Sequence, residues 1–323
     1  MKMLLCADVR LGMVSMENLD HRQSQKWQAA RNEKLVELID QASQNNAAYV
    51  ALFGRLFGQE RVTESVIDML FQTVREEPGI TVLVFVSASE KKRISYRNDV
   101  PENLHLINMA AQDSYQDDHV TVTISMDAVE LQLGGKQSVC INKDSSGRFL
   151  MTGLSNEAMV PAFEPVGFED AQAVKCGFGI LEWTGHQPGQ YQIKGGSKYA
   201  YKAIELKILP GEDQKEIQRK VTNSIRTIDA DTFLRVTLTG RSAFGITLNG
   251  DALKNQLQNR VFFVEVYDHT VMDIDEEAFE NDISLRSEFV RLALQDSSLS
   301  ESERNRLISL GWNALSGGEV SAE

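Results

Sequence analysis

Three short, mostly apolar runs in the first part of the chain each stop abruptly at polar or charged residues. Runs of this length are too short for a buried helix and are typical of buried parallel strands. In an open sheet of parallel strands the carboxyl ends meet at one edge, where ligands bind. We therefore expect the three turns that follow the runs to lie together. The runs are residues 3–7, 49–53 and 80–86, and they stop at Asp8, at Gly54-Arg55 and at Ser87-Ala88.

The segments between these runs have the apolar spacing of amphipathic helices, at residues 27–45 and 62–76. The order strand, helix, strand, helix, strand predicts a parallel sheet built by right-handed crossovers. From about residue 120 the pattern changes to short strands separated by glycine-containing turns, which predicts a second sheet stacked on the first. The fold class is therefore α/β, a two-sheet sandwich. The short strands are expected at residues 120–125, 128–133, 138–142, 149–151 and 178–183.

A second, smaller domain is expected to begin near residue 201. Its elements again alternate between strand and helix, which predicts a small α+β domain over residues 201–275. The remaining residues, 276–323, are expected to form a helical tail, whose second helix opens with a capping box of Ser300 and Glu303. The alternating elements are residues 204–209, 214–225, 233–239, 251–257 and 261–267, and the first tail helix is residues 284–295.

The composition limits the partners and the compartment of this protein. The 323 residues carry a net charge of −13, so bulk attraction to nucleic acid is not expected. The three cysteines are an odd number without a C-x-x-C pair, which favours reduced thiols in a cytoplasmic protein. No apolar run is long enough to span a membrane, and too few apolar residues precede Cys6 for a signal peptide.

Several phrases follow one another in the order known from one enzyme family. Residues 8–12, Asp-Val-Arg-Leu-Gly, are similar to that family's Asp-x-His-Leu-Gly, Gly54-Arg55 to its Gly-Asp, and residues 88–91 to its Gly-Asn-His-Asp. Residues 101–106 and 177–183 resemble later segments of the family, and residues 153–156 fall where it has Gly-His-x-His. On these motifs the chain resembles the SbcD-like branch of DNA-repair exonucleases, which are calcineurin-type metallophosphoesterases. The resemblance implies a phosphoesterase domain over 1–200, a capping domain over 201–275 and the helical tail.

The same resemblance shows which ligands are lost. Enzymes of this type hold two divalent ions, manganese or similar, about 3.5–4 Å apart. Only Asp8 survives from the ligand set, and none of the five histidines stands at a ligand position, since His186 belongs to a predicted hairpin turn at 185–189. Arg55 replaces the bridging aspartate, and an arginine at about 4 Å from a dication is repelled by roughly 8 kcal/mol at an effective dielectric near 20. We therefore predict a pseudo-enzyme without metal cofactors. The substituted positions are Arg10, Arg55, Ser89, Glu90, Asn142, Leu154 and Asn156.

Three alternatives remain for the remnant site. In the first, Asp8 pairs with Arg10 and Arg55 pairs with Glu90, which gives an internal ion network. In the second, two arginines and two lysines form a pocket for a phosphate or another anion, and the protein is a stand-alone binding module. In the third, an altered site around Asp8 and Glu90 retains metal-dependent nuclease or phosphodiesterase activity. The anion-binding candidates are Arg10, Arg55, Lys91 and Lys92.

The resemblance also implies partners. Family members work beside an SMC-like, coiled-coil ATPase of the SbcC type and commonly form dimers, so this chain is expected to scaffold or regulate such a complex and to contact DNA only through it. The apolar faces of the two tail helices are the candidate docking surface, although they could instead pack on the chain's own second domain. The candidate docking residues are Leu285, Phe289, Leu292, Leu307, Leu310 and Trp312.

Overall fold

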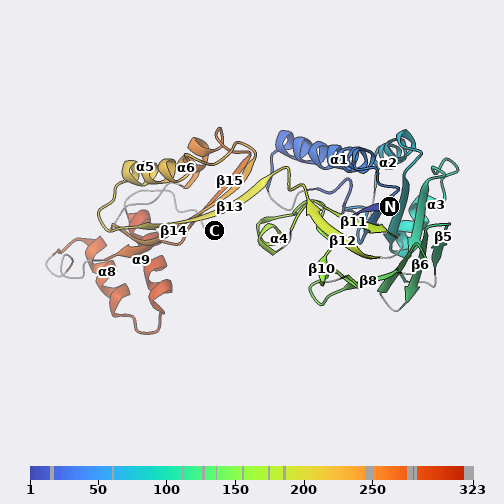
Figure 1. The fold of residues 1–323 in the computed structure, drawn as a ribbon. Coiled ribbons are helices and arrows are strands. Elements are labelled where there is room, and N and C mark those ends of the chain that lie inside the picture. Colours follow the sequence, from blue (N-terminus) through green and yellow to red (C-terminus); the bar gives the residue numbers. More distant parts are fainter. Residues whose placement is uncertain are drawn as a thin grey trace. The chain divides into compact units, whose positions relative to one another are not determined.

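The protein is represented by a computed structural model, in which residues 1–14, 18–59, 62–110, 113–125, 128–135, 137–154, 156–173, 175–184, 187–243, 250–274, 279 and 282–315 are described. The chain divides into two compact units, Met1–Lys198 and Tyr199–Glu323, each of mixed α/β structure (Figure 1). Within the described part of the chain, no helix combines the length and the apolar character that crossing a membrane requires.

The first unit is built on a six-stranded sheet with the order β12-β11-β1-β2-β3-β4. Strands β1, β2 and β3 run parallel, as the apolar runs predict, and β4 extends the parallel set while β11 returns antiparallel to β1. Figure 1 shows the helices α1 and α2 covering one face of this sheet. The bounds are β1 (Lys2–Ala7), α1 (His21–Gln44), β2 (Tyr49–Phe53), α2 (Glu64–Glu76), β3 (Thr81–Val86), α3 (Ala88–Ser95), β4 (Leu104–Asn108), β11 (Phe178–Thr184) and β12 (Gln187–Lys194).

The other sheet of this unit is antiparallel, with the order β10-β9-β8-β7-β6-β5. Its apolar side chains meet those of the first sheet in one continuous core, and a separate core lies between the first sheet and its helices. Because successive residues of a strand face opposite ways, β1 serves both cores: Leu4 and Cys6 face the helices, whereas Met3 and Leu5 face the second sheet. The bounds are β5 (Ser114–Gln116), β6 (Val120–Ser125), β7 (Ala128–Leu133), β8 (Gln137–Lys143), β9 (Phe149–Thr152), β10 (Ala158–Met159) and α4 (Phe168–Ala173).

The second unit contains a parallel sheet of β13, β14 and β15, with β16 pairing the far end of β14. Helices α5 and α6 pack on it through Ile217 and Leu253, which join Leu234 and Val236 in one core. Two further helices, α8 and α9, follow. The bounds are β13 (Ala200–Ile208), α5 (Gln214–Ser224), β14 (Thr232–Ala243), α6 (Gly250–Leu257), β15 (Phe263–Asp268), β16 (Val271–Asp273), α8 (Leu285–Gln295) and α9 (Glu301–Leu315).

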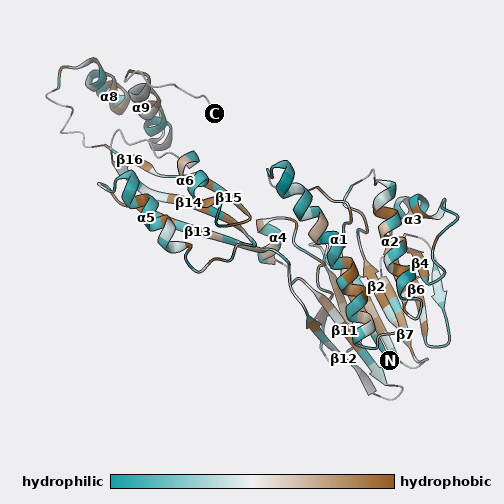
Figure 2. Ribbon diagram, turned by 90° about the horizontal axis from the view of Figure 1, so that it is seen from above, coloured by the Kyte–Doolittle hydropathy of each residue, from teal (hydrophilic) through white to brown (hydrophobic). Residues whose placement is uncertain are grey.

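Hydropathy follows this layering, since β2 is hydrophobic along its length whereas α1 also carries hydrophilic residues (Figure 2). The structure differs from the sequence-based expectation in several details. Residues 178–183, expected in the second sheet, form β11 of the first sheet, where they pair with β1. Helix α1 begins at His21 rather than at residue 27, because Asp20 and Gln23 form a capping box ahead of the apolar stripe. Residues 88–95 form the helix α3, whereas the sequence pattern predicts only the end of a strand at this point. The turn expected at 185–189 ends earlier, because β12 begins at Gln187; Gly185 and His186 lie outside the described residues.

Candidate functional site

The turns after β1 and β2 remain paired beyond the ends of their strands. The Asp8 N–H donates to the Phe53 carbonyl at 2.8 Å, and the Arg10 N–H donates to the Arg55 carbonyl at 3.0 Å. This pairing is maintained with Asp8 and Arg10 both in the left-handed region, at φ of 52° and 51°. Such backbone conformations are uncommon for residues other than glycine and cluster at functional sites. The first two predicted turns therefore meet in a fixed, unusual geometry.

The Asp8 carboxylate is held by protein groups at both of its oxygens. Its Oδ1 accepts the Arg55 N–H at 3.0 Å, and its Oδ2 lies 3.8 Å from the Arg10 guanidinium. The predicted pairing of Asp8 with Arg10 is thus confirmed. Gly54 makes this approach possible, because a Cβ atom there would lie 2.7 Å from Asp8 Oδ1 and 2.9 Å from the Phe149 ring.

The third turn joins the other two through Glu90, but not in the way that was predicted. The expected ion pair between Arg55 and Glu90 is wrong. Glu90 is buried, with 8% of its surface exposed, and its Oε1 accepts the N–H groups of Leu56 and Phe57 at 3.1 and 3.2 Å. Its Oε2 accepts the Ser87 N–H at 3.3 Å in a capping box that opens α3. The carboxylate faces these backbone donors because it occupies the third position of the helix, which points it back over the helix start.

The four anion-binding candidates are not brought into one group by any recorded contact. Arg10 is paired with Asp8. Lys91, on α3, instead forms an ion pair of 2.5 Å with Asp113, the residue before β5. Arg55 and Lys92 are exposed, and no ion pair to either is recorded within the described part of the chain. Ser89 is also exposed, with its hydroxyl 3.1 Å from that of Ser87.

The second sheet contributes different residues from those expected. Asn142 and Asn156 are exposed, and Leu154 packs against the core between the sheets, so no recorded contact joins any of the three to Asp8. Asn142 faces outward because its neighbour Ile141 faces the core, and alternate residues of a strand face opposite ways.

Phe149, at the start of β9, reaches Gly54 instead. It pairs in register with Lys143, whose Nζ lies 5.8 Å from the ring centroid. Sequence reasoning missed both residues. The sequence does show that the two residues flank the turn at Asp144–Gly147. Only the stacking of the two sheets, however, places this hairpin against Gly54.

Arg31 on α1 is another residue that sequence reasoning missed. Its side chain is 3% exposed, and its guanidinium donates to the carbonyls of Val9 at 3.1 Å and Pro165 at 3.2 Å. It also lies 5.0 Å from the Trp27 ring centroid. A signal existed in the sequence, because Trp27, Arg31 and Leu35 are spaced four residues apart on the apolar face of a helix. The arginine therefore braces the turn that carries Asp8 and Arg10.

One helical turn further along, Lys34 takes part in a partly buried polar cluster that we call the exit clasp. It is formed by Lys34, Glu164, Ser197 and the backbone of residues 196 and 198. Lys34 Nζ lies 3.6 Å from Glu164 Oε1 and donates to the Gly196 carbonyl at 2.5 Å. Glu164, only 5% exposed, accepts the Ser197 hydroxyl at 2.6 Å and the Lys198 N–H at 2.8 Å. The exit clasp fixes the last residues of the first unit.

In the tail, the six docking candidates divide into two groups. Phe289 and Trp312 belong to the packing between α8 and α9: a Cβ on Gly311 would lie 2.2 Å from the Phe289 ring, and Trp312 lies under the Arg286 guanidinium. The other four face solvent, with Leu285 73% and Leu292 60% exposed. Leu307 and Leu310 are 40% and 38% exposed. The pair of helices also packs on its own unit, where Met272 and Ile274 join its small core.

The residues around Asp8 do not fit the two-metal centre that the resemblance implies. Asp8 already accepts the Arg55 N–H at one oxygen, and the Arg10 guanidinium lies 3.8 Å from the other. Among the described residues, no group of three or more histidine, cysteine, aspartate or glutamate side chains is arranged to hold a metal ion. No protein-family model matches this chain, and a search of curated proteins finds no match to it.

Proposed function

We propose that this protein is a non-catalytic relative of the SbcD-like exonucleases that scaffolds or regulates an SMC-like, coiled-coil ATPase complex. The observation that carries the proposal is the state of Asp8, whose two oxygens are occupied by the Arg10 guanidinium and the Arg55 N–H. A metal ion bound at Asp8 would compete with both of these partners for the same two oxygens. The guanidinium would then remain beside the dications, which is unfavourable in a partly buried site.

Two further features support a scaffolding role. The turns at the carboxyl ends of β1, β2 and β3 are tied together by Asp8 and Glu90 through backbone hydrogen bonds, an arrangement suited to rigidity. The tail presents Leu285, Leu292, Leu307 and Leu310 to solvent. Large apolar side chains with this much exposure are found at protein–protein interaction sites.

A second candidate function, binding of a phosphate or another anion, is favoured by the charges near Asp8. Arg55 is exposed, and Lys143 lies over the Phe149 ring that touches Gly54. Asp8 neutralises only one of the positive charges in this area. Arginine and lysine side chains are the usual partners of phosphate groups in proteins.

The catalytic question is tested with purified protein, manganese and single-stranded or nicked DNA. We expect no manganese-dependent cleavage, because the remaining carboxylate is paired. The matched control is Asp8→Asn, which removes the one surviving ligand type and should behave like the wild type. Manganese-dependent cleavage that disappears in Asp8→Asn would refute the proposal. In the same preparation, an increase in melting temperature with inorganic phosphate that Arg55→Gln abolishes would identify the anion-binding function instead.

The docking surface is tested with the double variant Leu285→Glu, Leu292→Glu. These two residues are seven positions apart on α8, hence on one side of the helix, and both are exposed, so the change should leave the fold intact. We expect binding to a purified coiled-coil ATPase of the SbcC type to weaken at least about tenfold, as for a hot spot. The control is Val36→Glu, since Val36 on α1 is also exposed, at 37%. Equal binding by both variants and the wild type would exclude the tail as the docking surface.

A further inference from the structure

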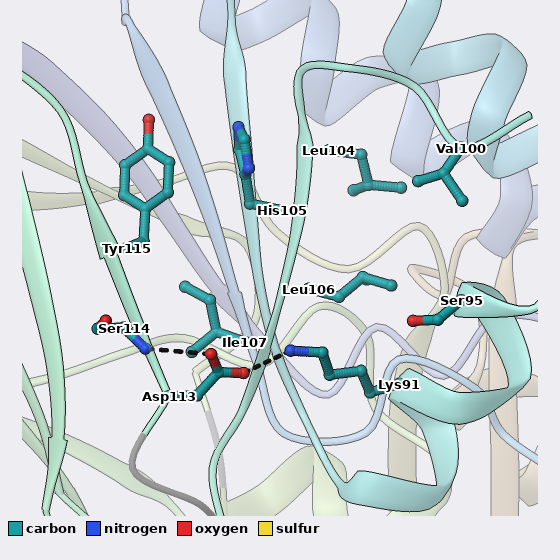
Figure 3. Close-up of a pocket in the computed structure, with 10 residues that line it drawn as sticks. All are labelled: Lys91, Ser95, Val100, Leu104, His105, Leu106, Ile107, Asp113, Ser114 and Tyr115. Atoms are coloured by element: carbon teal, nitrogen blue, oxygen red, sulfur yellow. Dashed lines mark hydrogen bonds and ion pairs between the residues drawn. The ribbon is translucent and has the colours of Figure 1, made fainter.

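A groove of about 440 Å³ runs along β4, the edge strand of the first sheet (Figure 3). Its floor is β4 itself, one wall comes from α3 and the segment that follows it, and the other wall comes from β5 and the residue before it. Figure 3 shows the Lys91–Asp113 ion pair, 2.5 Å long, which joins the two walls at the Asn108 end of the groove, so a bound chain would lie against the Leu106 side of it. The groove is separate from the Asp8 site, and no part of the function proposed above uses it.

Among the described residues, the backbone of β4 leaves one outward-facing residue, Leu106, without a recorded hydrogen-bond partner at the floor of this groove. In a parallel strand, alternate residues direct both N–H and C=O to the same neighbour. The bonds from the Val82 N–H to the Asn103 carbonyl and from the Met109 N–H to the Val86 carbonyl show that the odd-numbered residues of β4 face β3. The N–H and C=O groups of Leu106 therefore point away from β3, into the groove.

The outward-facing neighbours of Leu106 are already satisfied. The Leu104 N–H donates to the Pro101 carbonyl at 3.1 Å, and the Asn108 N–H donates to Asp113 Oδ2 at 2.8 Å. The structure records no partner for the Leu106 N–H among the residues that it describes. Within the described residues, the Leu106 N–H is thus a donor without a partner between two N–H groups that are hydrogen-bonded. The carbonyls of Leu104 and Leu106 also point outward on this side.

The walls of the groove offer different chemistry to the two sides of an extended chain. On the side of β4 that faces the helices, Val100 and Leu106 present apolar side chains, and Leu104 is buried beneath them. On the β5 side, the His105 ring lies against the Tyr115 ring, with centroids 4.7 Å apart. Because alternate side chains of an extended peptide point to opposite sides, one set would meet the apolar side chains and the other the aromatic pair.

We propose that this groove binds an extended segment of a partner protein, which adds to β4 as a strand and pairs with the N–H and C=O of Leu106. The open donor and the flanking carbonyls are the groups that strand addition uses, and the two walls supply side-chain selectivity. A second copy of this chain is a poorer occupant, because its own β4 lies at the floor of the same recess between α3 and β5. The preferred ligand has apolar residues at every second position.

The test uses the full chain and a phage library of random heptapeptides. We expect selection to enrich peptides with alternating apolar residues. The variant Leu106→Pro removes the open N–H without breaking a sheet hydrogen bond, since edge strands tolerate proline on the side that faces away from the sheet. The matched control Leu106→Ala shortens the side chain and keeps the N–H. Enriched peptides should lose at least about tenfold in affinity with Leu106→Pro, and clearly less with Leu106→Ala.

A second measurement decides the matter if Leu106→Pro does not fold. Hydrogen exchange on the wild type should show a rapidly exchanging Leu106 amide that becomes protected when an enriched peptide is added, whereas the His105 and Ile107 amides are protected throughout. The proposal is overturned if no peptide is enriched, or if Leu106→Pro binds as well as Leu106→Ala. It is also overturned if the Leu106 amide is protected without peptide in proportion to protein concentration, since a second copy would then be the occupant.

Discussion

Replacing Glu90 by alanine is expected to destabilise the protein by about 3–4 kcal/mol, the largest effect of any single charged residue near the site. Glu90 is buried and accepts backbone N–H groups from Leu56, Phe57 and Ser87. Without the carboxylate, the donors of Leu56 and Phe57 remain buried without a partner, and each such loss costs about 1–3 kcal/mol. The measurement is the free energy of unfolding from denaturant titration.

The matched control is Glu216→Ala. Glu216 holds the same third position in the capping box of α5, with Asp213 as the N-cap, but it is exposed and has no recorded role beyond the cap within the described residues. Its removal should therefore cost only about 0.5–1 kcal/mol. If the two variants lost equal stability, Glu90 would be an ordinary cap and the tie between the three turns would be dispensable.

Replacing Gly54 by alanine is expected to cost about 3 kcal/mol. Two effects add at this position. The backbone is left-handed, with φ of 79°, and the new Cβ would lie 2.7 Å from Asp8 Oδ1 and 2.9 Å from the Phe149 ring. The variant should also separate Asp8 from the Arg55 N–H, which would alter the remnant site. Thermal and denaturant unfolding measure the stability change.

Gly135→Ala separates the two effects. Gly135 has a similar φ of 71°, but a Cβ there would have no neighbour within 4 Å. Its substitution should cost only the backbone strain, about 1–2 kcal/mol. The difference between the two variants then measures the contact of Gly54 with Asp8 and Phe149. A Gly54→Ala variant no less stable than Gly135→Ala would show that the site accommodates a Cβ by moving those side chains.

The parts of the fold that could be predicted from sequence are those in which composition and burial agree. β1, β2 and β3 are buried on both faces, so their apolar runs are continuous and easily read. β4 was missed because it is an edge strand, in which only Leu104 and Ile107 are buried. Helix α3 was missed because Ser89 and Glu90 were considered as site residues, whereas Glu90 forms a capping box with Ser87.

At the site, the sequence indicated which turns meet but not what joins them. The Asp8–Arg10 pair was predicted because the two charges are close along the chain. Glu90 was assigned to Arg55 because opposite charges were matched with each other, whereas the carboxylate binds backbone N–H groups that a sequence does not display. Phe149 reaches Gly54 through the stacking of two sheets, which no local pattern contains. That the chain is an inactive relative of the SbcD-like exonucleases, and that it binds a coiled-coil ATPase, both stay predictions.

Helix α1 connects two distant stretches of the first unit. Arg31 holds the Val9 carbonyl in the turn after β1, and Lys34, on the next turn of the same helix, holds the Gly196 carbonyl and Glu164. A helix is stiff over a single turn, so a shift of α1 would displace both attachment points together. We therefore expect a displacement of residues 196–198 to be transmitted through α1 to the backbone of Val9, beside Asp8. The two attachment points on the helix, Arg31 and Lys34, are only three residues apart.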